Sequence, residues 1–116
     1  MLEKFLLYTK TVDFIAWVFP VINKFPKSQK FVLGQQIENM ALRFLEKIIR
    51  ANHQKEKAER QKILVELDID LQVLQALLRV AYLLHFLSSA QLEFALEKTK
   101  ELGKMLGGWM KQTVSV

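Results

Sequence analysis

Cysteine is absent from this 116-residue chain, and only two prolines and four glycines occur. Without cysteine there are no disulfides or thiolate metal sites, which fits a reducing, cytoplasmic compartment. Both prolines lie within residues 1–26, so the remainder lacks the strongest helix breaker. The longest apolar run, residues 14–22, contains Pro20 and is shorter than the ~18–20 residues of a membrane span. No small-residue cleavage site follows the apolar N-terminal segment, so a secretion signal is not expected. We therefore expect one cytoplasmic, helical domain over residues 1–116 that does not cross a membrane.

Apolar residues recur in alternating steps of three and four, the spacing of one helical face. This spacing predicts helices over residues 2–23, 30–51, 58–87 and 90–111, with Ser88-Ser89 as a candidate N-cap of the last. In the first helix it favours a core stripe of Phe5, Tyr8, Val12, Ile15, Phe19 and Ile22. In the third it continues from Leu64 to Ala81 and then to His85, which we expect to be packed in the core. Short loops between such helices predict an all-α, up-down-up-down antiparallel four-helix bundle.

The first helix carries more apolar side chains than one stripe requires. Phe14, Trp17 and Val18 fall off the predicted stripe. Soluble monomers seldom expose a large contiguous apolar area, so these residues are predicted to contact a second copy or another protein. We assign Trp109 of the last helix to the same partner-contacting set. The alternative is a wide core helix that its neighbours cover on both sides.

Patterns for catalysis or metal binding are not found. A di-iron bundle needs Glu-x-x-His pairs, which the chain lacks, and His53 with Glu56 forms only one His-x-x-Glu pair. The glycines of residues 103–108 lack the Gly-Lys-Ser/Thr ending of a phosphate loop, and they imply a packing reason such as close approach of a neighbouring helix. Glu66 and Asp70 share a helical face but interrupt a leucine ladder at solvent-facing positions. We therefore predict a non-enzymatic protein with no catalytic residue, metal or cofactor.

The formal charge of +5 favours polyanionic partners, although solubility alone would also account for it. In an antiparallel bundle many of the cations gather at the end that holds the second loop. The residues predicted to contact RNA or DNA are Lys47, Arg50, Lys55, Lys57, Arg60, Lys62, Lys104 and Lys111. Several have an acidic residue three or four positions away, so an ion-paired solvated surface remains an alternative.

Arg79 stands apart from these cations because every neighbour from Leu77 to Leu84 is apolar. A charge in such a stretch needs a partner. An intramolecular ion pair, a subunit contact and a nucleic-acid contact all remain open for it.

Four short motifs carry a family resemblance that spans nearly the whole chain. They are Phe19-Pro20, the segment 31–37 (FVLGQQI), Leu78-Arg79-Val80-Ala81 and the segment 106–111 (LGGWMK). With them the chain resembles the four-helix-bundle family that includes Avd, the accessory variability determinant of diversity-generating retroelements, and the rRNA-intervening-sequence proteins. The leucine-arginine step and the Leu-Gly-x-Trp ending resemble the Avd branch more closely.

The resemblance to Avd implies a positively charged homopentameric barrel. Such a barrel would bind the retroelement's reverse transcriptase and its RNA or DNA and would support mutagenic retrohoming. The other branch implies an adaptor or scaffold that binds protein partners only.

Overall fold

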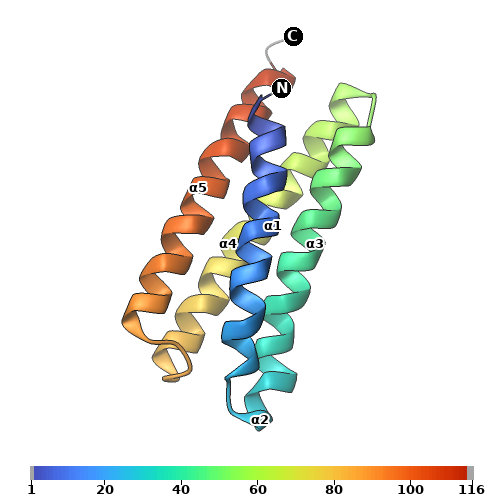
Figure 1. The fold of residues 1–116 in the computed structure, drawn as a ribbon. Helices are drawn as coiled ribbons and strands as arrows, with labels where there is room; N and C mark the ends of the chain where they lie inside the picture. Colours follow the sequence, from blue (N-terminus) through green and yellow to red (C-terminus); the bar gives the residue numbers. More distant parts are fainter. Residues whose placement is uncertain (1, 115–116) are drawn as a thin grey trace.

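The computed structural model describes the backbone of residues 2–114 and the side chains of residues 4–113. The remaining residues of the expected 1–116 domain lie outside this range. Four long helices account for most of the chain: α1 (Leu2–Asn23), α3 (Gln35–His53), α4 (Lys57–Leu83) and α5 (Ser89–Val114). A short helix, α2 (Lys27–Gln29), and a π-helical turn, η1 (Lys30–Gly34), lead into α3. Successive long helices run antiparallel in a bundle that measures 47 × 23 × 20 Å (Figure 1).

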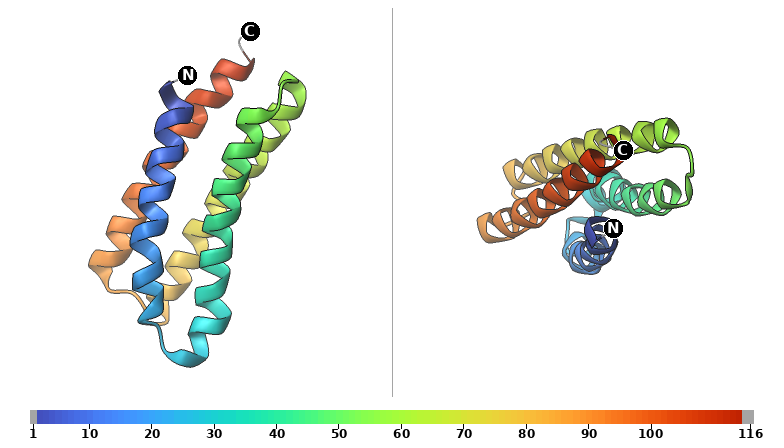
Figure 2. Two further views of the ribbon diagram at one scale, coloured as in Figure 1. Left: turned by 45° about the vertical axis from the view of Figure 1, so that its right-hand side comes forward. Right: turned by 90° about the horizontal axis from the view of Figure 1, so that it is seen from above.

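Each long helix packs against two others. α1 contacts α3 and α5, and α4 contacts the same two helices, so α1 and α4 lie at opposite corners (Figure 2). All elements of residues 2–114 are helical, which confirms the predicted four-helix bundle. The leucine ladder of α4 is buried as expected, from Leu64 to Ala81.

The buried face of α1 differs from the predicted one. Its core residues are Leu7, Thr11, Phe14, Val18 and Ile22. Three members of the predicted stripe are instead exposed, namely Phe5 (66%), Tyr8 (45%) and Val12 (39%). The prediction of the core stripe is therefore wrong for most of α1. Because α1 is apolar on both faces, its residue spacing fits two different stripes. The stripe that is buried contains the polar Thr11, so it is less apolar in the sequence than the predicted stripe.

The same apolar character makes α1 resemble a membrane span. Residues Lys4–Asn23 are long and apolar enough to cross a bilayer by length and composition alone. A core helix of a soluble bundle satisfies the same test, and here one face of α1 packs against α3 and α5.

α4 ends at Leu83, four residues before the expected end at 87. His85 adopts a left-handed conformation with φ 67°, its N–H donates to the Tyr82 carbonyl, and the Phe86 N–H donates to the Ala81 carbonyl. These two bonds form a Schellman cap, in which glycine usually takes the left-handed position. His85 is consequently exposed, and its predicted place in the core is wrong.

α5 begins with the expected serine cap. The Gln91 N–H donates to Ser88 Oγ at 3.0 Å, and the Ser88 N–H donates to Gln91 Oε1 at 2.9 Å. This reciprocal pair satisfies two backbone donors at the helix start.

Close packing at the α1–α3 connection explains one glycine. The chain becomes helical at Lys27, earlier than the predicted residue 30, and η1 then brings Gly34 against α1. A Cβ on Gly34 would lie 2.7 Å from Cγ2 of Ile22. Any larger residue would push the two helices apart.

Candidate nucleic-acid interface and partner surfaces

Lys47 is held between two helices. Its Nζ on α3 lies 2.7 Å from Asp70 Oδ2 and 3.3 Å from Glu66 Oε1 on α4. The hydrogen bond to Asp70 is the main cause that raises the pKa of Lys47 above 10.5, followed by that to Glu66, while burial acts in the opposite direction. Glu66 and Asp70, expected on a solvated face, therefore join α3 to α4. Lys47 is predicted to contact nucleic acid, but its ammonium group is ion-paired with these two carboxylates of the same chain.

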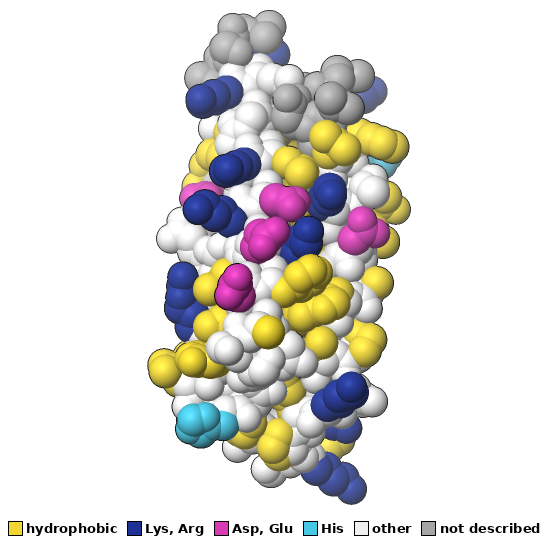
Figure 3. All heavy atoms as spheres, turned by 60° about the vertical axis from the view of Figure 1, so that its left-hand side comes forward, with side chains coloured by type: hydrophobic (Ala, Val, Ile, Leu, Met, Phe, Trp, Pro, Cys, Tyr) yellow, Lys and Arg dark blue, Asp and Glu magenta, His cyan; other side chains and the backbone are white. Residues whose placement is uncertain are grey.

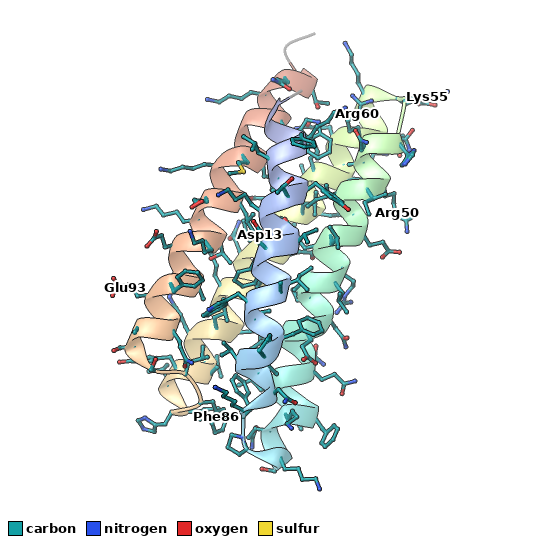
Figure 4. All side chains as sticks on the ribbon, in the orientation of Figure 1. Asp13, Arg50, Lys55, Arg60, Phe86 and Glu93 are labelled. Atoms are coloured by element: carbon teal, nitrogen blue, oxygen red, sulfur yellow. The ribbon has the colours of Figure 1, made fainter. Side chains whose placement is uncertain are left out.

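Three other predicted contact residues also have partners. Arg50 pairs with Glu46 at 3.2 Å and Lys62 pairs with Glu59 at 3.1 Å, both on the surface of a single helix. The Arg60 guanidinium donates through Nε and Nη2 to the carbonyl of Gln54, so it braces the α3–α4 loop. Figure 4 shows Arg50, Lys55 and Arg60 near the same end of the bundle. The ion-paired alternative therefore describes Arg50 and Lys62, although exposed pairs of this kind are weak.

The remaining predicted cations make no ion pair with other residues of the described range: Lys55, Lys57, Lys104 and Lys111. Lys100 shares this property and was missed by the sequence analysis. Lys100, Lys104 and Lys111 are spaced by four and seven residues, which places them on one exposed face of α5. We call these three residues the lysine row. Figure 3 shows lysine and arginine side chains following one another along the upper part of this side of the molecule.

The surface beside the lysine row is unusually bare. A Cβ on Gly103 would meet Leu71 Cδ2 at 3.4 Å, an ordinary contact with α4, whereas one on Gly107 would meet no atom within 4 Å. The packing reason predicted for the glycines of residues 103–108 is therefore modest for Gly103, and it fails for Gly107 among the described residues. Gly107 instead leaves α5 backbone accessible between Lys104 and Lys111.

The outer face of α4 is an apolar ridge that the sequence analysis missed. Its residues recur in steps of four, four, three, four and three, and all are exposed: Val65, Ile69, Val73, Ala76, Val80 and Leu83. This face points away from the buried leucine ladder. Ile69 and Leu83 are the most exposed, at 54% and 71%. We call this set the α4 ridge.

A second apolar surface lies between α1 and α3. A groove of about 220 Å³ there is lined by Lys4, Phe5, Tyr8, Ile48, Ile49 and Asn52. Val12 and Leu42 extend the exposed apolar area along the same two helices. We call this surface the α1–α3 groove. The apolar excess of α1 is therefore real, although it involves other residues than those predicted.

The predicted partner-contacting residues mostly belong to the core. Phe14, Val18 and Trp109 are only 3%, 0% and 4% exposed, so their assignment to a partner surface is wrong. Trp17 is half-buried against Phe14 and Phe94. Each of these side chains fills the monomer's own interior, wholly or in part.

Arg79 is exposed beside the α4 ridge and forms no ion pair with another residue of the described range. An ion pair with another described residue is thereby removed from the open alternatives for Arg79. A subunit contact and a nucleic-acid contact remain.

Within residues 2–114 no three His, Asp or Glu side chains gather closely enough to hold a metal ion. The candidate site consists of three surfaces: the lysine row, the α4 ridge and the α1–α3 groove.

Comparison with known proteins agrees with this architecture. A crystal structure of a protein of unknown function from the S23 ribosomal protein family of Bacteroides thetaiotaomicron superposes with a TM-score of 0.86. The alignment covers 94% of this chain and 98% of that one at 17% sequence identity, so it supports the fold alone. No curated protein matches the chain. A family model described as bAvd-like matches residues 5–113. With nearly its whole length covered by that model, the chain belongs to the bAvd-like family.

Proposed function

We propose that this chain is a non-enzymatic accessory protein of a diversity-generating retroelement. In this role it binds the element's reverse transcriptase and its RNA or DNA in the cytoplasm and supports mutagenic retrohoming. Membership of the bAvd-like family supports the role. The observation that carries the nucleic-acid part is the lysine row, whose three cations lack ion-pair partners in the described chain.

The lysine row has a spacing suited to a nucleic-acid backbone. At 1.5 Å per residue, Lys100 and Lys104 lie about 6 Å apart along the helix axis, and Lys104 and Lys111 about 10 Å. Such distances are comparable to the separation of neighbouring or next-neighbouring phosphates. Gly107 lets a phosphate approach the helix closely between them. When ammonium groups contact phosphates, they displace the cations that are condensed on the nucleic acid. The release of these counterions is the main source of non-specific affinity.

Self-association would bury both apolar surfaces. The α4 ridge is convex and the α1–α3 groove is concave, and they face different sides of the bundle. A ridge-in-groove contact between successive copies is heterologous, and such contacts produce a ring when the rotation closes. The two surfaces are not diametrically opposed, because the groove lies between α1 and α3 and α3 also neighbours α4. Because the ridge and the groove are at an angle to each other, each added copy would be rotated relative to the previous one, which favours a closed ring. We propose the pentamer that the family resemblance implies.

The experiment combines assembly, nucleic-acid titration and a partner assay on the full chain. Light scattering should give a mass near five times the 13.6 kDa chain mass. RNA and DNA affinity should fall steeply with salt, with a log-log slope set by the number of phosphates neutralised. The reverse transcriptase encoded beside the gene should copurify with it. A monomer mass at micromolar concentration together with no binding at low salt would overturn the proposal.

The second candidate is an adaptor that binds protein only. The ion pairs of Lys47, Arg50 and Lys62 favour it, because they reduce the number of free cations at the predicted end. Under this alternative the reverse transcriptase or another protein copurifies, whereas RNA and DNA do not bind even at low salt.

A further inference from the structure

A small aromatic slot lies at the seam between α1 and α5 and shares no residue with the surfaces described above. It has a volume of about 190 Å³ and is lined by Lys10, Asp13, Phe14, Trp17, Phe94, Lys98 and Glu101. That volume equals roughly six water molecules at about 30 Å³ each, so it suits one ring-sized group. Asp13 lies near the middle of α1 (Figure 4). Figure 3 shows acidic and basic side chains interleaved above a hydrophobic patch on this side of the molecule.

Three aromatic rings form the apolar part of the slot. The Trp17 and Phe94 ring centroids are 4.7 Å apart at 44°, and the Phe14 and Trp17 centroids are 6.0 Å apart at 40°. Trp17 is half-buried and Phe94 is exposed, so ring surface remains accessible. Contact with an aromatic surface favours a planar guest.

The rim carries two charges of each sign. α1 contributes Lys10 and Asp13, and α5 contributes Lys98 and Glu101. Lys98 Nζ lies 3.6 Å from Glu101 Oε1 and 5.3 Å from the Phe94 ring centre. Asp13 is exposed and has no ion pair within the described residues. Each helix therefore presents both a hydrogen-bond donor and an acceptor to the slot.

The balanced rim selects among possible guests by charge. A charged guest gains no net Coulombic attraction from this rim, because a phosphate, a carboxylate, an arginine or a lysine would meet two charges of its own sign as well as two of the opposite sign. A neutral planar group with both donors and acceptors can use all four rim charges. A nucleobase with an exocyclic amino group has this chemistry, since carboxylates accept from the amino group and ammonium groups donate to ring nitrogens or carbonyls.

The slot and the proposed phosphate surface share helix α5. Lys98 and Glu101 of the rim lie in the same stretch of α5 as Lys100 and Lys104, and the lysine row lies about a third of a turn around the helix from the rim. A strand whose phosphates follow the lysine row could turn one unstacked base toward the α1 side. Base stacking on aromatic side chains, with flanking cations for the backbone, is a common mode of single-strand binding.

We propose that the α1–α5 slot binds one unpaired, amino-bearing nucleobase of single-stranded RNA or DNA. The proposal rests on the nucleic-acid part of the proposed function and specifies it. The guest stacks on Trp17 and Phe94, Asp13 and Glu101 accept from its amino group, and Lys10 and Lys98 donate to its acceptors.

The test compares oligodeoxycytidine with an abasic strand of equal length and phosphate count, using the full chain. The base-bearing strand should bind at least about fivefold more tightly, because stacking contributes roughly 1–3 kcal/mol per base. It should also quench the emission of Trp17. Phe94→Leu should remove most of this preference and leave the affinity for the abasic strand unchanged. Phe31→Leu is the matched control, because Phe31 is an exposed phenylalanine on η1 and its change should leave the preference intact.

A second measurement examines the rim. Oligodeoxycytidine should bind more tightly than oligodeoxythymidine, which lacks an exocyclic amine, and Asp13→Asn should reduce that difference. Equal binding of base-bearing and abasic strands would overturn the slot proposal while the proposed function stands. Failure of every strand to bind at low salt would overturn both. If the reverse transcriptase quenches the emission of Trp17 and no nucleic-acid strand does so, the slot is a protein contact and the proposal is overturned.

Discussion

α4 and α5 are neighbouring helices of similar length, yet their outer faces differ completely. The outer face of α4 is the apolar ridge, from Val65 to Leu83. The outer face of α5 starts with the exposed acids Glu93 and Glu97 and continues with the lysine row. Charge along α5 follows the helix dipole, with acids near the N-terminus and cations near the C-terminus. Under the proposed function, α4 supplies the protein contact and α5 supplies the polyanion contact.

The largest expected effect concerns the α4 ridge. Ile69→Lys combined with Leu83→Lys should abolish self-association and yield monomers, because two charges would enter an apolar interface. Both residues are more than half exposed, so circular dichroism should show an unchanged helix content. Gln35→Lys combined with Gln36→Lys adds the same charge at exposed polar positions and should leave the assembly intact. If light scattering gives the ridge variant the same mass as the unmodified chain, the α4 ridge is not the self-association surface.

The second effect concerns the lysine row. Replacing Lys100, Lys104 and Lys111 with Ala should flatten the salt dependence of binding, by about 2 units of log-log slope on single strands and about 3 on duplex DNA. The fold and mass should stay unchanged, since exposed lysines contribute little to stability. The control replaces Lys24, Arg50 and Lys62 with Ala and should change the slope less, because two of these are ion-paired and Lys24 lies at the opposite end. Equal slopes for the two triple variants would contradict the prediction that unpaired cations contribute more to phosphate binding than ion-paired ones.

The third effect is at the junction of the two helices. His85→Gly should stabilise the chain by about 1 kcal/mol, because glycine takes the left-handed conformation without the cost that a Cβ imposes. Urea denaturation of both proteins at one concentration measures the difference. Ser88→Ala, which removes the reciprocal cap of α5, should change stability in the opposite direction by about 1 kcal/mol. A destabilised glycine variant would mean that the histidine side chain has its own favourable contact.

The fourth effect contrasts the partly buried, ion-paired Lys47 with the free cations. Since the folded-state pKa of Lys47 is raised above 10.5, its stabilisation is complete below pH 10.5 and is lost as the pH rises through the folded-state value. Lys47→Met should therefore lower stability by about 1 kcal/mol at neutral pH, with a smaller deficit above that range. Lys104→Met, at an unpaired position, should show no such trend. A deficit that is constant with pH would contradict the role of the Asp70 pair.

The smallest effect concerns Gly107. Gly107→Ala should stabilise the isolated chain by about 0.5–1 kcal/mol, because alanine favours the helix and the added Cβ meets no atom within 4 Å. If a phosphate approaches the backbone there, the same change should weaken RNA binding. Thermal denaturation and RNA titration on one preparation give both readings. Unchanged RNA affinity would confine the phosphate contacts to the lysine side chains.

Sequence reasoning succeeded where one pattern dominated. The leucine ladder of α4, the serine cap of α5 and the number of long helices follow from local spacing and cap chemistry. It failed on α1, where two apolar faces gave two equivalent stripes. It also failed beyond Leu83, because Leu84 and His85 continue the apolar spacing and the stop comes from a Schellman cap without glycine.

The candidate site could be predicted only in part. The sequence pointed to Lys104 and Lys111, which are exposed and make no ion pair with other described residues, and their contact with nucleic acid stays a prediction. Whether a cation is free depends on tertiary partners, and Lys47 meets Asp70 across 23 residues of sequence. The α4 ridge is hard to see in the sequence because it shares residues 64–83 with the more apolar leucine ladder, and both faces follow the same spacing of three and four.

The contact between α1 and α5 sets an order for biosynthesis. α1 is made before the other long helices of residues 2–114, yet α5, one of its two neighbours in the bundle, is made after all of them. At about 5–20 residues per second, the segment from Leu83 to the C-terminus takes a few seconds to translate. During that interval the side of α1 that α5 will cover stays uncovered beside its outward apolar face. The packing of α1 in the bundle is therefore complete only after α5 has been made.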